Sequence, residues 1–370
     1  MIINGHKNIW VVVLRLKNNN GDNTMFNNKR LLLASGLLVL AGSAHAGYEI
    51  KLTDKDTITF GGYIKGDVRY INGDVTSPVT DNNYWIGHAA EGDIEQVEFS
   101  VRETRFNTKY THGEVTGFIE MDFYSNTGNE IISNSTNPRI RHAFIKYQNW
   151  TVGQTWSTFV NTSALAEAAD FGGPLNAAAF IRQGQVRYTH GGFQVAIENP
   201  ESDKGDPSQD SVPDVIAKYT FKGDWGNVSV AGLARQLNTV GGNSESAFGY
   251  GIAGRIKVGA QDDFRFQLHG GETGRYVGVV AARDLVGEEV EETTSFSVAY
   301  RHFWTEGVRS TVFYGSTEAD VADTKRVHWG VNLFKNYTPK LSLGVEFGNF
   351  KMDEIDKDSD YLQFSAKYVL

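Results

Sequence analysis

The sequence predicts an all-β protein, a sixteen-stranded antiparallel transmembrane β-barrel, and two observations carry that prediction. Sixteen strand-like segments follow one another after residue 56, and many of them alternate apolar and polar side chains. The connections between these segments alternate between seven short turns and eight long loops. Up-and-down strands with both termini on one side of a membrane give this alternation, with short periplasmic turns and long extracellular loops. A β-sandwich or a propeller has no reason to sort its connections in this way.

The first residues are expected to lie outside the barrel. Lys29 and Arg30 precede an apolar stretch at 31–41, and Ala44-His45-Ala46 follows it. A basic segment, a short apolar stretch and an A-x-A site are typical of a cleaved secretory signal peptide. We therefore expect residues 25–46 to be a signal peptide and residues 47–370 to form the barrel in a bacterial outer membrane. Residues 1–24 are expected to be an upstream extension that is either not translated or not structured.

Composition narrows the class of protein further. The chain contains no cysteine, which excludes a disulfide framework in an exported protein. It carries a net charge of −9 without a basic arm, which argues against nucleic acid as a partner. The nine histidines lack zinc-binding spacing, so no metal, cofactor or catalytic residue is predicted. Frequent glycine (40 residues) and aromatic residues (22 Phe, 16 Tyr and 7 Trp) suit strands that alternate between lipid and water.

The strands are expected in the following order, and most are close to the roughly 9–11 residues that a tilted membrane strand needs. They fall near 57–70, 97–110, 114–124, 139–147, 150–156, 183–189, 193–198, 214–221, 227–236, 249–258, 263–270, 294–304, 308–316, 326–334, 341–350 and 361–370. The segments 97–110 and 139–147 change phase partway, which indicates either a bulge or a patch that faces a neighbouring subunit. Segment 275–281 is a possible additional strand.

The last segment illustrates how faces are assigned. Leu362, Phe364 and Ala366 alternate with Gln363 and Ser365, so one face is apolar and the other polar. An open sheet edge cannot lie in hydrocarbon, so this strand is expected to close the cylinder. Aromatic residues near strand ends are expected to form interfacial girdles. These are Tyr70, Tyr110, Tyr124, Tyr147, Trp150, Trp225, Trp304 and Tyr337.

Charged faces are expected to point into an aqueous channel, because each Arg or Lys on the lipid face near mid-bilayer costs roughly 2–4 kcal/mol. The bases assigned to the channel are Lys65, Arg69, Arg187, Lys218, Arg255, Lys257, Arg265, Arg301 and Lys367. The acids are fewer, namely Asp67, Glu120, Asp122, Glu198 and Glu346. An excess of bases predicts a preference for anions. The alternative is that these charges are the mixture found in any water-filled barrel and do not select a solute.

The loop at 157–182 is rich in small apolar residues, which is unusual for an exposed loop. Ala164, Ala166 and Ala168 lie in this segment, together with the acidic residues Glu167 and Asp170. We expect the loop to fold into the barrel and to narrow it, with Glu167 and Asp170 facing the basic wall. The alternative is an Ala-rich helical turn on the outer surface.

Several motifs around this loop resemble a known family. They are Gly153-Gln154-Thr155-Trp156-Ser157-Thr158-Phe159, Asp170-Phe171-Gly172-Gly173-Pro174, Arg182-Gln183-Gly184-Gln185-Val186-Arg187-Tyr188-Thr189 and Glu198-Asn199-Pro200-Glu201, with Phe60 to Lys65 and Glu103 to Asn107. In these motifs the chain is similar to the DcaP-like outer-membrane porins. The resemblance implies a homotrimer of sixteen-stranded barrels that passes small anions, with dicarboxylates as the best-known class. It also implies that Arg182 and Arg187 lie at the narrowest point. Many family members carry a coiled-coil segment before the barrel, whereas only Gly47 to Asp56 separate the predicted cleavage site from the first strand here.

The sequence therefore predicts a passive porin rather than an enzyme. Its expected partners are small anionic solutes and the lipid and lipopolysaccharide of the outer membrane. One alternative is a structural or adhesive barrel that binds a surface partner through its acidic loops. A second is an outer-membrane hydrolase, which would need a Ser-His pair such as Ser157 and His190.

Overall fold

The computed structural model describes residues 47–76, 88–125, 131, 133–279 and 281–370. The predicted signal peptide at 25–46 and the upstream extension at 1–24 lie outside these residues. None of the helical segments in the described ranges is long and apolar enough to cross a membrane.

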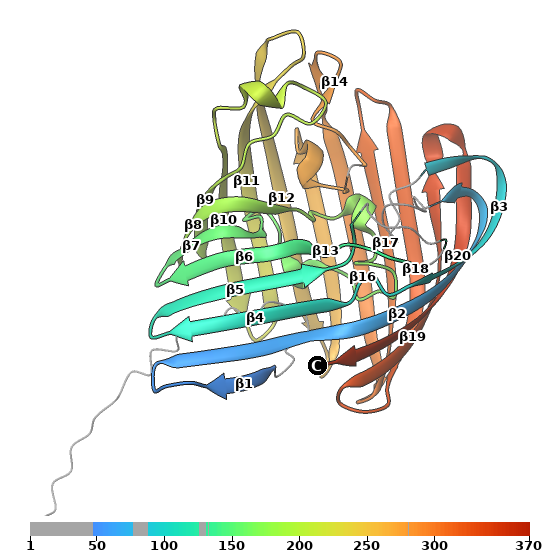
Figure 1. Ribbon diagram of the computed structural model, residues 1–370. Helices are drawn as coiled ribbons and strands as arrows, with labels where there is room; N and C mark the ends of the chain where they lie inside the picture. Colours follow the sequence, from blue (N-terminus) through green and yellow to red (C-terminus); the bar gives the residue numbers. More distant parts are fainter. Residues whose placement is uncertain (1–46, 77–87, 126–130, 132, 280) are drawn as a thin grey trace, which may run out of the picture. The chain divides into compact units, whose positions relative to one another are not determined.

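One antiparallel sheet closes on itself, because β2 (Asp56–Thr76) pairs with β20 (Lys357–Val369) (Figure 1). This sheet contains 18 strands. β3 (His88–Ser100) and β4 (Arg105–His112) are two halves of one barrel strand, since both pair with β2 along the same edge. β1 (Tyr48–Lys51) is a short addition to the opposite edge of β2. The ring itself therefore has sixteen strands, which confirms the predicted fold class.

The other ring strands are β5 (Val115–Asp122), β6 (Arg139–Tyr147), β7 (Trp150–Trp156), β8 (Arg182–His190), β9 (Phe193–Glu198), β10 (Asp214–Gly223), β11 (Gly226–Asn238), β12 (Ser244–Val258), β13 (Asp262–Gly271), β16 (Thr293–Thr305), β17 (Val308–Ala319), β18 (Thr324–Asn336) and β19 (Leu341–Met352). β14 (Leu285–Val286) and β15 (Glu289–Val290) form a separate small hairpin. Five 3₁₀ turns complete the described structure: η1 (Thr162–Ala164), η2 (Leu175–Ala177), η3 (Pro207–Gln209), η4 (Gly274–Tyr276) and η5 (Asp353–Ile355).

The two ends of the barrel chain meet along one edge of β2. β1 pairs with residues 57–60 of β2, and β20 pairs with residues 63–73 of the same strand. The backbone N–H of Leu370 donates to the carbonyl oxygen of Gly62 at 3.1 Å, in the gap between the two pairings. β1 therefore continues the line of β20 along β2.

The outer surface of the ring is apolar, as a lipid-facing surface requires. Exposed side chains on the strands include Phe60, Ile64, Phe99, Ile145, Val230, Phe248, Val298, Val331 and Phe364. Trp150, Trp225 and Trp304 are exposed close to the short turns, where interfacial aromatic residues were predicted. Tyr124 is different, because it is buried and its ring lies 4.5 Å from that of Phe171. Tyr124 is therefore not part of an interfacial girdle.

Strand lengths differ around the ring. β4 to β9 have 6–9 residues, whereas β10 to β13 and β16 to β20 have 10–15. In the long part, pairing extends into segments that the sequence assigned to loops, namely 237–248, 317–325 and 351–360. These segments are polar, but backbone pairing between neighbouring strands satisfies their N–H and C=O groups as well as water does. The corresponding loops are therefore shorter than predicted.

The two segments with a phase change contain irregularities in the sheet. The strand formed by β3 and β4 is interrupted at 101–104. Val97 and Phe99 are exposed before the break, Val101 is exposed at its first residue, and Phe106 is exposed after it. β5 and β6 shift register between Glu120 and Met121. Each break changes which side chains point inward. Residues 275–279 do not add a barrel strand, since they form the end of η4 and one isolated bridge between Val277 and Ala179.

Candidate functional site

The segment 157–181, between β7 and β8, lies inside the ring of strands, where Figure 1 draws it in green. Inward-pointing side chains of the wall hold its backbone carbonyls at 2.6–2.9 Å. These hydrogen bonds run from Lys218 to Val160, from Asn332 to Glu167, from Lys65 and Gln363 to Ala169, and from Thr317 to Asn176. Small residues suit this course, because Ala164, Ala169, Ala177, Ala178 and Ala179 are all buried. We refer to residues 157–181 as the inner loop.

The carboxylate of Glu167 ties the middle of the inner loop to β16 and β17. It forms ion pairs with Arg301 at 2.9 Å and with Arg309 at 2.6 Å. Burial alone would raise the pKa of Glu167, but the hydrogen bonds and charges of Arg309 and Arg301 outweigh it and lower this pKa to about 2. Glu167 is therefore ionised at neutral pH and holds two arginines on the wall.

A second acidic group follows three residues later. Asp170 forms an ion pair with Arg69 on β2, and both side chains are buried. The Glu346 carboxylate on β19 accepts hydrogen bonds from the backbone N–H of Ala169 at 2.7 Å and of Asp170 at 3.1 Å. Lys65 contacts the Glu103 carboxylate and lies 3.4 Å from Asp67. The inner loop is thus fixed at its turn by charges on strands β2 and β19.

One set of four arginines lies on β12, β13, β16 and β17. Arg255, Arg265 and Arg301 share the carboxylate of Asp263 at 3.0, 2.6 and 2.5 Å, and Arg309 joins them through Glu167. We call these six residues the Asp263 group. Four guanidinium groups thus share two carboxylates. Lys257 lies opposite Asp263 in the sheet register and is exposed.

The other set lies around Trp156, on β4, β6 and β8. Arg141 and Arg182 lie 5.9 and 4.9 Å from the ring of Trp156, and Arg141 and Arg105 lie 6.0 and 5.5 Å from the ring of Phe171. Arg139 lies over Tyr124, which packs on Phe171. The carboxylates are Asp122, paired with Arg139 at 2.7 Å and Arg141 at 3.0 Å, and Glu120, paired with Arg141 at 2.9 Å. We call Arg105, Arg139, Arg141, Arg182, Glu120 and Asp122 the Trp156 group.

The two groups lie on opposite parts of the ring. β9 to β11 separate them on one side of the ring, and β18 to β20 with β2 separate them on the other. Of the remaining residues assigned to the channel, Arg187 donates to the carbonyl of Trp156 at 3.3 Å and Lys218 to that of Val160 at 2.8 Å. Arg187 lies on β8, the strand of Arg182, and Lys218 lies on β10, between the two groups.

Sequence reasoning missed four arginines of these groups: Arg105, Arg139, Arg141 and Arg309. The first three lie at the sheet irregularities in 97–110 and 139–147, where an alternating pattern cannot assign a face. The phase change itself was the available signal, because arginines next to a break in alternation are candidates for the interior. Arg309 lies second in β17, beside a turn, where the pattern is weakest.

The proposed hydrolase pair is not brought together. Ser157 is buried, and its Oγ accepts the backbone N–H of Phe159 at 3.0 Å. His190 is exposed at the far end of β8, eight residues from Arg182, which pairs with Trp156 beside Ser157. At about 3.3 Å per residue, this separation is roughly 26 Å.

Comparisons with known proteins agree with this architecture. Residues 93–362 match the DcaP outer membrane protein family. The crystal structure of the outer membrane channel DcaP of Acinetobacter baumannii is 23% identical, covers 88% of this chain and 100% of that chain, and superposes with a TM-score of 0.75. No curated protein matches the chain.

More distant porins share the fold. The anion-selective porin from Comamonas acidovorans is 11% identical, covers 85% of this chain and 100% of that chain, and has a TM-score of 0.57. Salmonella typhi OmpF, solved with daunomycin, is 13% identical, covers 87% of this chain and 100% of that chain, and has a TM-score of 0.56. The family match spans most of the chain, and the solved structures share its β-barrel fold. The chain belongs to the DcaP outer membrane protein family, as its sequence motifs predicted, and forms an outer-membrane β-barrel.

Proposed function

We propose that the protein is a passive diffusion channel that prefers small anions, dicarboxylates among them. The observation that carries the proposal is the pair of arginine groups, each with four guanidinium groups and two carboxylates that form ion pairs with them. Guanidinium forks match carboxylates in a bidentate geometry and keep their charge at all physiological pH values. Rings of Arg and Lys favour anions in pores.

The residues proposed to line the passage combine the two groups with the other predicted bases. They are Lys65, Arg69, Arg105, Arg139, Arg141, Arg182, Arg187, Lys218, Arg255, Lys257, Arg265, Arg301 and Arg309, with the acids Glu120, Asp122, Glu167 and Asp170. The inner loop is proposed as the constriction, because it carries Phe171 to the rings and arginines of the Trp156 group.

The first experiment is the reversal potential of the refolded protein in a planar bilayer under a KCl gradient. Chloride preference is expected. An Arg182→Gln variant should lower the chloride-to-potassium permeability ratio by up to about sevenfold. A charge roughly 7 Å from a permeating ion stabilises chloride and destabilises potassium by about 0.6 kcal/mol each in water. The matched control is Lys335→Gln, which removes a charge that is exposed beside Tyr337 on the outer face of β18 and should leave the ratio unchanged.

Two other outcomes would contradict the proposal. Potassium preference in the wild type would mean that the arginine groups do not control the passage. No conductance from a correctly folded protein would favour the structural or adhesive barrel, which the filling of the lumen by loops makes the second candidate.

We also propose that the channel is a homotrimer. One structure of Vibrio cholerae OmpT, which shares the fold with a TM-score of 0.50, is described as a trimer form. The short strands β4 to β9 make a low part of the wall with exposed apolar residues such as Ile140, Ile145 and Val152. Light scattering of the detergent-solubilised protein should give three times the mass of one chain, and a monomer would refute the assignment.

A further inference from the structure

One part of the barrel interior is dry. Ile216 on β10 and Ala231 and Leu233 on β11 belong to an apolar cluster whose other members are Phe159, Val160, Ala179, Tyr276 and Val277. All eight residues are buried. The cluster thus joins two wall strands to the inner loop and to the connection between β13 and β16. If the loops moved away, these apolar side chains would contact the water of the barrel, which is unfavourable. Their burial therefore favours loops that stay in place.

The connection between β13 and β16, described at residues 272–279 and 281–292, is the second loop. It pairs with the inner loop through an antiparallel bridge between Val277 and Ala179. The N–H of Phe180 donates to the carbonyl of Tyr276 at 3.3 Å, and the N–H of Gly278 donates to that of Ala178 at 3.0 Å. Gly278 has φ +80°, and a Cβ there would lie 2.6 Å from the carbonyl oxygen of Asn176. The junction therefore leaves no room between the two loops.

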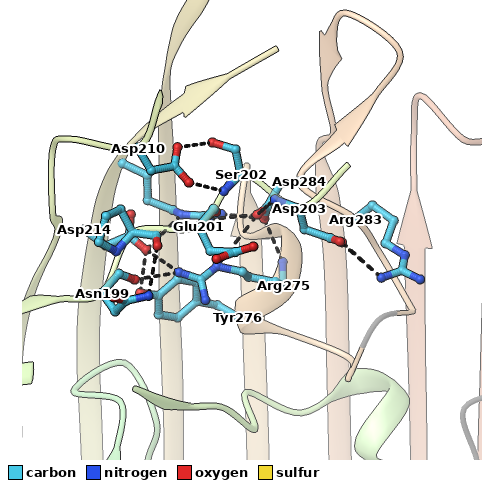
Figure 2. Close-up of polar contacts among 12 residues, drawn as sticks. Asn199, Glu201, Ser202, Asp203, Asp210, Asp214, Arg275, Tyr276, Arg283 and Asp284 are labelled. Carbon is cyan, nitrogen blue, oxygen red and sulfur yellow. Dashed lines mark hydrogen bonds and ion pairs between the residues drawn. The ribbon is translucent and has the colours of Figure 1, made fainter. Parts of the chain in front are cut away.

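Buried charges anchor the second loop to the wall. Figure 2 shows Asp214, Arg275 and Asp284 meeting around Tyr276. Arg235 on β11 pairs with Asp284 at 2.6 Å and with Asp214 at 3.2 Å, and its side chain is 0% exposed. Arg275 pairs with Asp214 at 3.0 Å, and the Tyr276 hydroxyl donates to the same carboxylate at 2.8 Å. Two arginines thus neutralise two aspartates within the network.

The same network includes the loop between β9 and β10. The backbone N–H of Asp203 donates to Asp284 at 3.0 Å, and Arg235 donates to the carbonyl of Glu201 at 2.8 Å. Ser202 is held by Asp210 through its backbone N–H at 2.7 Å and its hydroxyl at 2.6 Å. Arg283 pairs with Asp203 at 3.1 Å nearer the surface, with 39% of its side chain exposed. Arg235 therefore ties together two loops and one wall strand.

We infer that the second loop is a fixed inner wall. With the inner loop it closes the part of the lumen along β10 to β13 that lies nearer the long loops, leaves Arg255 and Lys257 beside the short turn open, and directs solutes past the Trp156 group. Arg235 is the positioning residue of this wall. The inference rests on the proposed channel function and adds the element that sets pore size and makes every solute pass the arginines of β4, β6 and β8.

A cysteine pair tests whether the loop is fixed. Val277 and Ala179 form a non-hydrogen-bonded antiparallel pair, whose short Cα separation suits a disulfide. The chain has no cysteine of its own, so Ala179→Cys with Val277→Cys gives a clean readout. The disulfide should form on oxidation, and oxidised and reduced channels should conduct equally. Failure to form the bond, or a conductance that changes on reduction, would overturn a fixed wall.

Shortening the loop tests what it does. Replacing residues 274–289 by a short Gly-Ser linker would free the wall of β10 to β13, roughly a quarter of the ring. Single-channel conductance should rise by roughly a third, and the chloride-to-potassium permeability ratio should fall. Unchanged conductance and selectivity would overturn the inference even if the wild type prefers chloride. A wild type without chloride preference would instead count against the proposed function.

A matched pair of point variants completes the test. Arg235→Met should release the loop, lower the yield of the 179–277 disulfide and raise conductance. Arg283→Met removes an arginine from the exposed edge of the same network and should change neither. If Arg235→Met does not fold, the loop-shortened channel gives the same readout without that variant. Equal disulfide yield and conductance in the two point variants would overturn the positioning role of Arg235.

Discussion

Replacing Glu167 by glutamine should weaken the attachment of the inner loop more than any other single isosteric change in it. Glutamine keeps the size of the side chain but removes the negative charge that Arg301 and Arg309 share. Arg301 retains Asp263 as a partner, whereas Arg309 retains the Asn336 side chain at 3.0 Å and the ring of Phe334 at 5.3 Å. The variant therefore leaves a half-buried guanidinium group without a carboxylate.

The size of the effect follows from the pKa of Glu167. The wall lowers this pKa from 4.5 to about 2, and one pKa unit corresponds to about 1.4 kcal/mol. The docked loop thus favours the ionised form by about 3 kcal/mol. Only 22% of the side chain is exposed, so solvent screening reduces this figure little. We expect Glu167→Gln to lower the free energy of unfolding by about 2–3 kcal/mol.

Reversible urea unfolding of the refolded protein in detergent would measure this loss, in a double-mutant cycle with Arg309→Gln. The coupling energy between the two positions should exceed about 1 kcal/mol, because the two side chains lie in direct contact. The matched control is Glu318→Gln, whose partner Lys325 lies at 2.5 Å but on an exposed surface. That control should change stability by less than about 1 kcal/mol.

Two results would refute the reasoning. A coupling energy below about 0.3 kcal/mol would mean that Glu167 and Arg309 act independently, within the usual scatter of additivity. Equal losses for Glu167→Gln and Glu318→Gln would mean that burial adds nothing to the ion pair.

Three further predictions concern two charges of the wall, a glycine at a strand start and the pH dependence of Glu167. Arg187→Glu with Arg255→Glu should weaken anion preference, since it reverses two charges on the wall; unchanged reversal potentials would contradict the channel assignment. Gly226→Ala should lower the free energy of unfolding by roughly 1–3 kcal/mol, because Gly226 has φ +128° and a Cβ there would lie 2.1 Å from the carbonyl oxygen of Arg255. Gly232→Ala, with open space around it, should cost well under half as much in the same urea titration. Because the pKa of Glu167 is lowered on docking, its stabilisation should be complete above pH 4.5 and disappear as the pH falls to about 2, so the stability difference between the wild type and Glu167→Gln should vanish over that range.

Regular alternation made most of the fold predictable. All sixteen ring strands overlap the segments expected from the sequence, because lipid on one side and water on the other impose a period of two along each strand. Strand ends were less predictable. β11, β12 and β17 to β20 continue beyond the predicted limits. In these extensions apolar and polar side chains do not alternate clearly, so the sequence gives little sign of a strand.

The side chains that point into the barrel could be predicted only where apolar and polar residues alternate regularly. Lys65, Arg69 and Arg301 lie on regular strands, and alternation assigned their faces. Arg105, Arg139 and Arg141 lie at breaks. The dry cluster around Ile216 and Leu233 depends on two loops that are more than 35 residues away in sequence. A local pattern carries no information on such a contact. The motif around Trp156 pointed to the right region, although not to the arginines that gather there.

The meeting of β1 and β20 on β2 has a consequence for how the barrel assembles. The hydrogen bond between Arg69 and Gln363 joins residues 294 positions apart, close to the longest separation that the barrel allows. Closing a loop of that length costs about 5 kcal/mol of chain entropy. This cost falls only after the other strands of the ring have paired and brought β2 and β20 together. Zipping of β20 onto β2 should therefore be the last and slowest step of folding. β1 then occupies the stretch of β2 that β20 cannot reach, so the seam is sealed from both chain ends at once.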